Sequence, residues 1–202
     1  MADSTSHTVL GVALRAHCGH LEVLLAGGRL PESRVAAREP PAAALARALD
    51  VAALAHVEQL ETRLLRDGRL ATAYLGLAQA DALLDGDWRF EHALPPDHAE
   101  LVAVAQSRLR AKLSYTNVGF ALAPRTFTIS ELRDLYLAAL GHDVSATNLR
   151  RILLRRGLLQ ATGAERAPGR EGGRPAALFQ FRTHTLAITD QFAVLRPPTG
   201  GG

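Results

Sequence analysis

Residues 145–156, SATNLRRILLRR, constrain the fold of this chain more than any other segment. Ser145 stands where a serine caps a helix, and Gly157 stands where a glycine ends one. Between them, leucine and isoleucine recur on one side at helical spacing, while arginines and polar residues occupy the opposite side. A glycine-rich basic segment follows. The pattern predicts a helix with one apolar face and one cationic face, followed by a β-hairpin.

The elements expected around this helix have the order of a winged helix-turn-helix. Asp97 stands at a helix start with Glu100 at capping-box spacing, and Ser130 precedes a further amphipathic run. Phe179 and Phe181 alternate along the second of two short strands. Three longer helices followed by a hairpin form a winged helix. We expect helices at 97–113, 115–122, 130–140 and 146–156, and strands at 158–162 and 176–182.

The first half of the chain has a different pattern, with strands around an alanine-rich helix. A polar loop is expected at 27–41, and a second loop at 80–96 contains Trp88, the one tryptophan. The prolyl pair at 95–96 separates the two patterns, and we predict domains at 1–96 and 97–202. The expected elements of the first domain are strands within 8–26 around a turn at 17–20, a helix at 42–53, and strands at 57–62 and 70–78.

Charge is distributed unevenly along the 202 residues. The net charge is +3, but residues 1–96 carry −3 and residues 97–202 carry +6. Residues 145–174 alone hold seven arginines against two glutamates. Concentrated positive charge of this kind is typical of a phosphate-binding surface.

Several functional classes find no support in the composition. No apolar run approaches the roughly 20 residues that span a bilayer, and the first residues lack the basic and apolar regions of a secretory signal. One cysteine, Cys18, precludes an intrachain disulfide, so we expect a cytoplasmic protein. His17, Cys18 and His20 lie in an expected hairpin turn without a second ligand pair, and we expect no metal and no cofactor.

The cationic side of helix 146–156 carries side chains that read bases in the major groove. Arginine pairs with guanine, and asparagine pairs with adenine. We therefore expect a double-stranded DNA operator as partner, bound by a homodimer with half-sites about one turn apart or a multiple of it. The residues expected at the groove are Thr147, Asn148, Arg151 and Arg155, with Arg150 on the flank of the helix, and those expected on phosphates are Lys112, Arg170 and Arg174.

Four segments carry a resemblance to a known family: DHAELV (97–102), LRAKLSYTNVGFAL (109–122), FTISELRDLY (127–136) and GGRPAALFQF (172–181). Together they resemble the Nudix-related transcriptional regulators of the NrtR type, and the resemblance extends over about residues 8–182. It implies an α+β protein in which a Nudix-like α/β/α sandwich precedes a winged helix. It also implies a nucleotide effector such as ADP-ribose, acting through a sensor and dimerisation domain.

The Nudix pattern G-x5-E-x7-R-E-U-x-E-E-x-G-U fits the first domain only in part. Glu39 and Arg47 take the first glutamate and the arginine, and we assign them to effector binding. The later glutamate positions hold Ala48, Val51 and Ala52. Alkyl side chains cannot ligate the divalent cations that pyrophosphate hydrolysis needs. The domain is therefore expected to have no catalytic residues.

Two other functions remain open at this point. The winged helix could serve as a protein-interaction or dimerisation surface, although such a surface does not require an arginine face. The first domain could be a diverged Nudix hydrolase with relocated carboxylates. The arginine face favours the DNA-binding regulator.

Overall fold

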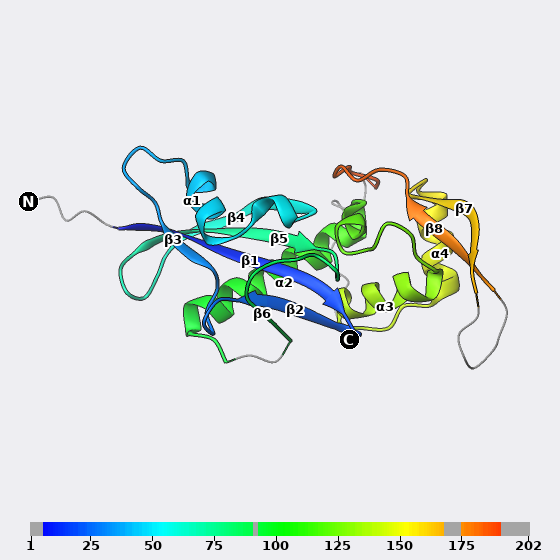
Figure 1. Cartoon of the computed structure of the whole chain (residues 1–202), viewed down its shortest axis with the longest axis horizontal. Coiled ribbons are helices and arrows are strands. Elements are labelled where there is room, and N and C mark those ends of the chain that lie inside the picture. The colour runs from blue at the N-terminus through cyan, green and yellow to red at the C-terminus, as the bar shows by residue number, and fades with distance from the viewer. Residues whose placement is uncertain (1–5, 91–92, 168–174, 191–202) are drawn as a thin grey trace, which may run out of the picture.

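Six strands form one sheet in the N-terminal part of the molecule (Figure 1). The order is β4-β5-β1-β2-β6, with β3 paired to the start of β1, and every pairing is antiparallel except that of β1 with β5. The computed structural model describes residues 6–90, 93–167 and 175–190. The strands are β1 His7–His17, β2 His20–Leu25, β3 Glu32–Arg34, β4 His56–Leu64, β5 Leu70–Ala78 and β6 Asp87–Arg89.

The central strand β1 packs on a helix at each face of the sheet. Val9 lies in a cluster with the helix α1 (Pro41–Ala48), whereas Leu10 and Leu14 lie in a cluster with the helix α2 (Pro96–Tyr115). Successive side chains of a strand point to opposite faces. The helices therefore cover opposite faces, with α1 in front of the sheet and α2 behind it in Figure 1. The expected α/β/α sandwich is confirmed.

Two of the segments expected as loops contain short edge strands. Strand β3 lies within 27–41, and strand β6 lies within 80–96 and includes Trp88. Each has only three residues. Three residues are too few to show the alternation of apolar and polar residues that predicts a strand. Pairing with β1 and β2 therefore determines that β3 and β6 are extended.

The alanine-rich helix is shorter than the sequence predicts. Helix α1 ends at Ala48, and Leu49 is extended. The Asp50 side chain accepts a hydrogen bond from the Ala52 backbone N–H at 3.0 Å and begins a 3-10 turn. An aspartate that caps a new turn in this way competes with continuation of the helix. The prediction of one helix over 42–53 is therefore wrong.

The start of α2 also differs from expectation. Pro95 is the N-cap residue and no side chain caps the helix, whereas Asp97 and Glu100 both receive hydrogen bonds from Arg66. The expected capping box is thus replaced by ion pairs to the β4–β5 turn. A capping box does form at helix Ile129–Leu140, where the N-cap is Thr128 and not Ser130. The Thr128 hydroxyl accepts from the Glu131 N–H, and the Glu131 carboxylate accepts from the Thr128 N–H.

The C-terminal part is a winged helix around one apolar core. The core contains Phe127, Leu132, Leu153 and Phe181, all with 3% exposure or less. Helix α4 is capped by Ser145 and followed by Gly157 at a φ of 67°, as the sequence predicts. The elements are η2 Val118–Ala121, α3 Ile129–Leu140, α4 Ala146–Arg155, β7 Leu159–Arg166 and β8 Ala176–Phe181.

The division of the chain at residue 96 stays a prediction. Helix α2 buries Leu101, Ala105 and Leu109 in the same cluster as the β1 side chains, and this cluster continues into the winged helix. We propose that α2 belongs physically with the sheet, so that the DNA-binding unit begins after Tyr115. No helix within the described residues is long and apolar enough to cross a membrane.

Residues 183–190, here called the return segment, run from the wing back to the end of α2 (Figure 1). The buried Asn117 side chain donates to Thr183 Oγ1 and to the Thr185 carbonyl, and it accepts from the Ala187 N–H. The Thr189 N–H bonds to the Tyr115 carbonyl at 2.8 Å. The return segment is therefore fixed to the junction between the sheet part and the winged helix.

Tyr136 of α3 provides a test of the winged-helix core. Its hydroxyl is buried without a hydrogen-bond partner among the described residues, and burial raises its pKa. Desolvation of such a group costs about 1–3 kcal/mol. We expect Tyr136→Phe to raise the free energy of unfolding in urea by about 1 kcal/mol. Tyr74→Phe is the control, because that hydroxyl is not among the buried unpartnered atoms. A loss of stability in Tyr136→Phe would contradict this packing.

Candidate nucleic-acid interface

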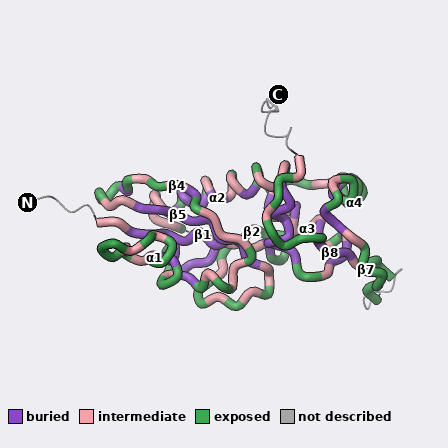
Figure 2. Tube along the Cα trace, turned by 90° about the horizontal axis from the view of Figure 1, so that it is seen from above, coloured by how far each residue is buried: buried purple, intermediate pink, exposed green. Residues whose placement is uncertain are grey.

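Helix α4 presents most of its polar side chains to solvent at the end of the molecule farthest from the sheet (Figure 1). Leu149 and Leu153 anchor it in the core, and the Ser145 hydroxyl accepts from the Asn148 N–H at 3.4 Å. Figure 2 shows the exposed face of the helix. All five residues expected at the groove are exposed on α4: Thr147, Asn148, Arg150, Arg151 and Arg155.

Two of the exposed arginines are oriented by neighbouring side chains. Arg151 Nη2 donates to Asn148 Oδ1 at 2.7 Å, so these two groups form one polar pair on the surface. The Arg150 guanidinium lies over the Phe179 ring at 5.6 Å, close enough for a cation–π contact. The structure therefore brings arginine and asparagine side chains together on one surface. Their contacts restrain the side chains before any DNA binds.

One α4 residue that the sequence reasoning overlooked is Leu154. It is 38% exposed and lines the same shallow groove as Arg150 and Arg151. The signal was present, because position 154 lies seven residues after Thr147 and hence on the same side of the helix. A leucine at that place is unusual for a purely electrostatic surface.

Other basic residues of this region are paired with acids. Arg156, which closes α4, forms an ion pair with Asp190 of the return segment at 3.2 Å. Arg166 of β7 pairs with Glu131 at the start of α3. Arg170 and Arg174, predicted as phosphate ligands of the wing, lie outside the described residues.

Lys112 is placed away from this surface. Its Nζ lies 2.8 Å from Glu58 Oε2 of β4, and its side chain is 11% exposed. His56 and Arg108 contact the same carboxylate at 3.1 and 3.4 Å. Lys112 therefore holds α2 on the sheet, and we leave it out of the interface proposed below. Sequence alone shows its charge but not its distant partner.

This cluster predicts a dependence of stability on pH. Burial raises the pKa of Glu58, but hydrogen bonds from Lys112 and His56 outweigh it, so that the pKa lies below its ordinary value of 4.5. A lowered folded-state pKa stabilises the protein above the unfolded-state value, and this stabilisation is lost as pH falls through the folded-state pKa. We expect Glu58→Gln to cost about 1 kcal/mol in urea unfolding at pH 7.

The difference between wild type and Glu58→Gln should shrink as the pH falls below about 4.5. Glu165→Gln, a change at an exposed position of β7, is the control and should leave the free energy of unfolding unchanged both at pH 7 and below about pH 4.5. A difference that grew as the pH fell would contradict the assigned ion pairs.

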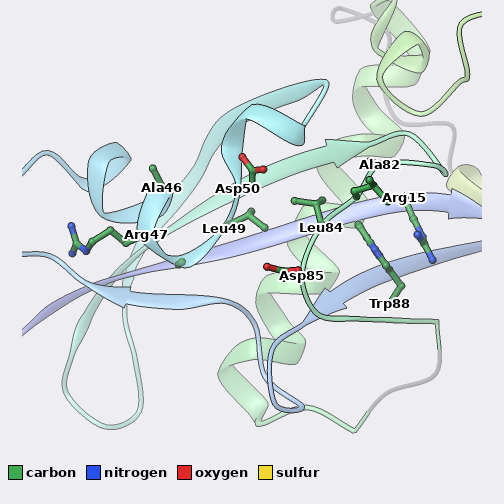
Figure 3. Close-up of a pocket in the computed structure, with 11 residues that line it drawn as sticks. Arg15, Ala46, Arg47, Leu49, Asp50, Ala82, Leu84, Asp85 and Trp88 are labelled. Carbon is green, nitrogen blue, oxygen red and sulfur yellow. The ribbon is translucent and has the colours of Figure 1, made fainter.

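A pocket of about 670 Å³ lies between the end of α1 and the loop before β6 (Figure 3). Arg15 and Trp88 stand at one end and Arg47 at the other, with Asp50 and Asp85 between them. The Arg15 guanidinium covers the Trp88 ring at 4.4 Å and bonds Glu22 at 2.7 Å. The pocket lining therefore includes an aromatic ring stacked under one guanidinium and a second arginine at the opposite end.

The two residues assigned to effector binding pair with each other. Arg47 donates to Glu39 and to the Arg34 carbonyl, and Glu39 also accepts from the Ala36 N–H. Arg47 lines the pocket, whereas Glu39 is not among the lining residues and forms an ion pair with Arg47. The described parts of the chain contain no group of three or more metal-ligating side chains.

Comparisons with known proteins agree with this architecture. Residues 119–181 match the model of the NrtR DNA-binding winged helix domain. The ADPR responsive transcriptional repressor NtrR of Acinetobacter baylyi is 34% identical over 85 residues, or 42% of this chain. The match spans 33%, about a third, of that relative's length.

Two solved structures extend the likeness over most of the chain. NrtR of Shewanella oneidensis, in complex with a 27mer DNA, is 28% identical with a TM-score of 0.71, covering 87% of this chain and 93% of its own. A MutT/nudix family protein from Enterococcus faecalis is 18% identical with a TM-score of 0.66, covering 91% and 90%. At that identity, the second match shows the fold alone.

The fold and these matches define a protein in which a Nudix-like sandwich is joined to a winged helix. The match of residues 119–181 adds the particular type of winged helix. The resemblance to the Nudix-related regulators of the NrtR type, expected from four sequence segments, is thereby confirmed.

Proposed function

We propose that this chain is a cytoplasmic transcriptional regulator that binds duplex DNA through α4 and the wing. The observation that carries the proposal is the exposed arginine face of α4, within a winged helix that matches a DNA-binding family model. The similar protein of Shewanella oneidensis has been solved with a 27mer DNA, which supports DNA binding by this chain.

The residues of α4 divide into two roles. Arg151 and Asn148, already paired, read base edges in the major groove, where each side chain has a preferred base. Arg155 lies on the same side of the helix and Arg150 lies on its flank, and both contact bases or phosphates. We keep the wing residues Arg170 and Arg174 as phosphate contacts that fix the register.

A single reading helix in each chain implies a homodimer on a two-fold operator. Hydroxyl-radical footprinting of the DNA upstream of this protein's gene tests that geometry. We expect two protected half-sites with centres about one helical turn apart, or a multiple of it. A single protected half-site would contradict the dimer, and no protection would contradict DNA binding.

We further propose that the pocket beside Trp88 binds a nucleotide effector such as ADP-ribose. The similar Acinetobacter baylyi protein is an ADPR responsive repressor, and Arg15, Arg47 and Trp88 line the pocket of this chain. The effector must bind the DNA-bound and the DNA-free protein with different affinities. By the same factor, bound effector then changes the affinity for DNA. Calorimetric titration with and without operator DNA should therefore give two different affinities for ADP-ribose.

The pocket is proposed to sense and not to hydrolyse its ligand. The alkyl side chains of Ala48, Val51 and Ala52 support this, because they stand where the pattern needs magnesium ligands. Magnesium-dependent release of phosphate from a nucleotide panel would overturn this part of the proposal. An absence of binding heat at millimolar ADP-ribose would remove the effector assignment.

A further inference from the structure

The exposed face of α4 is apolar at its centre. Leu154 is 38% exposed, and it lines the same pocket as Arg150 and Arg151 on the side of the helix that carries Thr147. The other leucines of this helix, Leu149 and Leu153, are buried in the core. Leu154 is therefore less buried than these two leucines, and part of its side chain is open to solvent.

Leu154 forms one wall of a shallow groove of about 290 Å³. Ile129, the first residue of α3, forms the opposite wall, and Ala146 and Thr147 of the first turn of α4 complete the lining. Arg150 and Arg151 stand at the rim. The groove is thus made of aliphatic groups and surrounded by positive charge.

The rim arginines are engaged beside the groove. Arg150 lies over the Phe179 ring, and Arg151 bonds Asn148 Oδ1 at 2.7 Å. These contacts restrain both guanidinium groups, so that the aliphatic walls stay open to a partner. The cationic rim complements a polyanion, which favours duplex DNA over an apolar peptide or a second copy of this chain.

The major groove of duplex DNA offers donors, acceptors and one apolar group, the 5-methyl of thymine. We propose that the groove between Ile129 and Leu154 receives this methyl group, so that the protein selects thymine at that position. The inference rests on the proposed function, because it requires α4 to lie in the major groove. Leu154 is then a specificity-determining residue, because the polar side chains of Arg151 and Asn148 do not provide the apolar contact with the methyl group.

Deoxyuridine provides a direct test, because it differs from thymidine only by this methyl group. The full-length chain first enriches duplexes from a random pool. Each thymine of the enriched duplex is then replaced by deoxyuridine, and the dissociation constant is measured by fluorescence anisotropy. Burial of one methyl group predicts an about four-fold weaker complex for each methyl that enters a groove, and no change elsewhere.

The variant Leu154→Ala should bind the thymine and deoxyuridine duplexes with nearly equal affinity. Alanine favours the helix, so the fold should persist. Leu64→Ala is the matched control, since Leu64 is an exposed leucine of β4 with 66% exposure, and it should keep the four-fold difference. We expect the difference of about four-fold between the two duplexes to disappear in Leu154→Ala and to persist in Leu64→Ala.

Two results would overturn the methyl site and leave the proposed function standing. The first is an enriched duplex in which no deoxyuridine weakens binding. The second is a methyl effect that persists unchanged in Leu154→Ala. Enrichment of no sequence at all would instead overturn the proposed function, and the methyl site with it.

Discussion

Arg151→Ala should weaken binding to the operator by about 5- to 150-fold while leaving affinity for scrambled DNA nearly unchanged. Arg151 is exposed on α4, and its contact with Asn148 holds the guanidinium in a defined orientation. A bidentate contact with guanine is worth about 1–3 kcal/mol of discrimination, and the range of the expected effect follows from that value. Fluorescence anisotropy on both duplexes measures it.

Two controls separate base reading from charge. Arg89→Ala removes an exposed arginine of β6, in the sheet part, and should change neither affinity. Arg150→Ala removes a flanking charge and should weaken both complexes, with a salt slope lower by about one. Equal losses on both duplexes for Arg151→Ala would contradict its assignment as a base-reading residue.

Asn117→Ala should lower the free energy of unfolding by about 3 kcal/mol. Asn117 is 2% exposed, and its amide makes three hydrogen bonds to the return segment. The variant loses these three hydrogen bonds, each with a net contribution of about 0.5–1.5 kcal/mol. Detachment of the segment would also lose the Arg156–Asp190 ion pair that closes α4.

Urea unfolding measures this loss, and Asn148→Ala is the matched control. Asn148 is exposed on α4, so its replacement should change stability by less than about 0.5 kcal/mol. Asn117→Ala should also weaken operator binding, because Arg156 and the end of α4 lose their support. A variant as stable as wild type would show that the return segment contributes nothing to the winged helix.

The sequence predicted the elements whose signals are local. Ser145 and Gly157 bound α4, and the alternation of Phe179 and Phe181 identifies β8, because caps and periodicity act within a few residues. The family resemblance supplied the fold class of the first half. The exposed positions of all five α4 residues also followed from the helical period.

What the sequence missed depends on partners distant in the chain. Lys112 has the same charge whether it contacts a phosphate or Glu58, and only the fold brings β4 against α2. The role of Asn117 is equally invisible, since its three bonds join segments with no common pattern. The break of α1 after Ala48 is decided by Asp50, whose cap competes with an alanine-rich helix pattern.

The most direct test of the account is the anisotropy of the full-length chain on the duplex upstream of its own gene and on a scrambled duplex. Each is measured at roughly 50 and 200 mM salt, because phosphate contacts make affinity fall steeply with salt. We predict binding to the upstream duplex about 10³-fold tighter than to the scrambled one or better, with a steep salt slope. Weak binding of equal strength to both duplexes would contradict a regulator that reads DNA through α4.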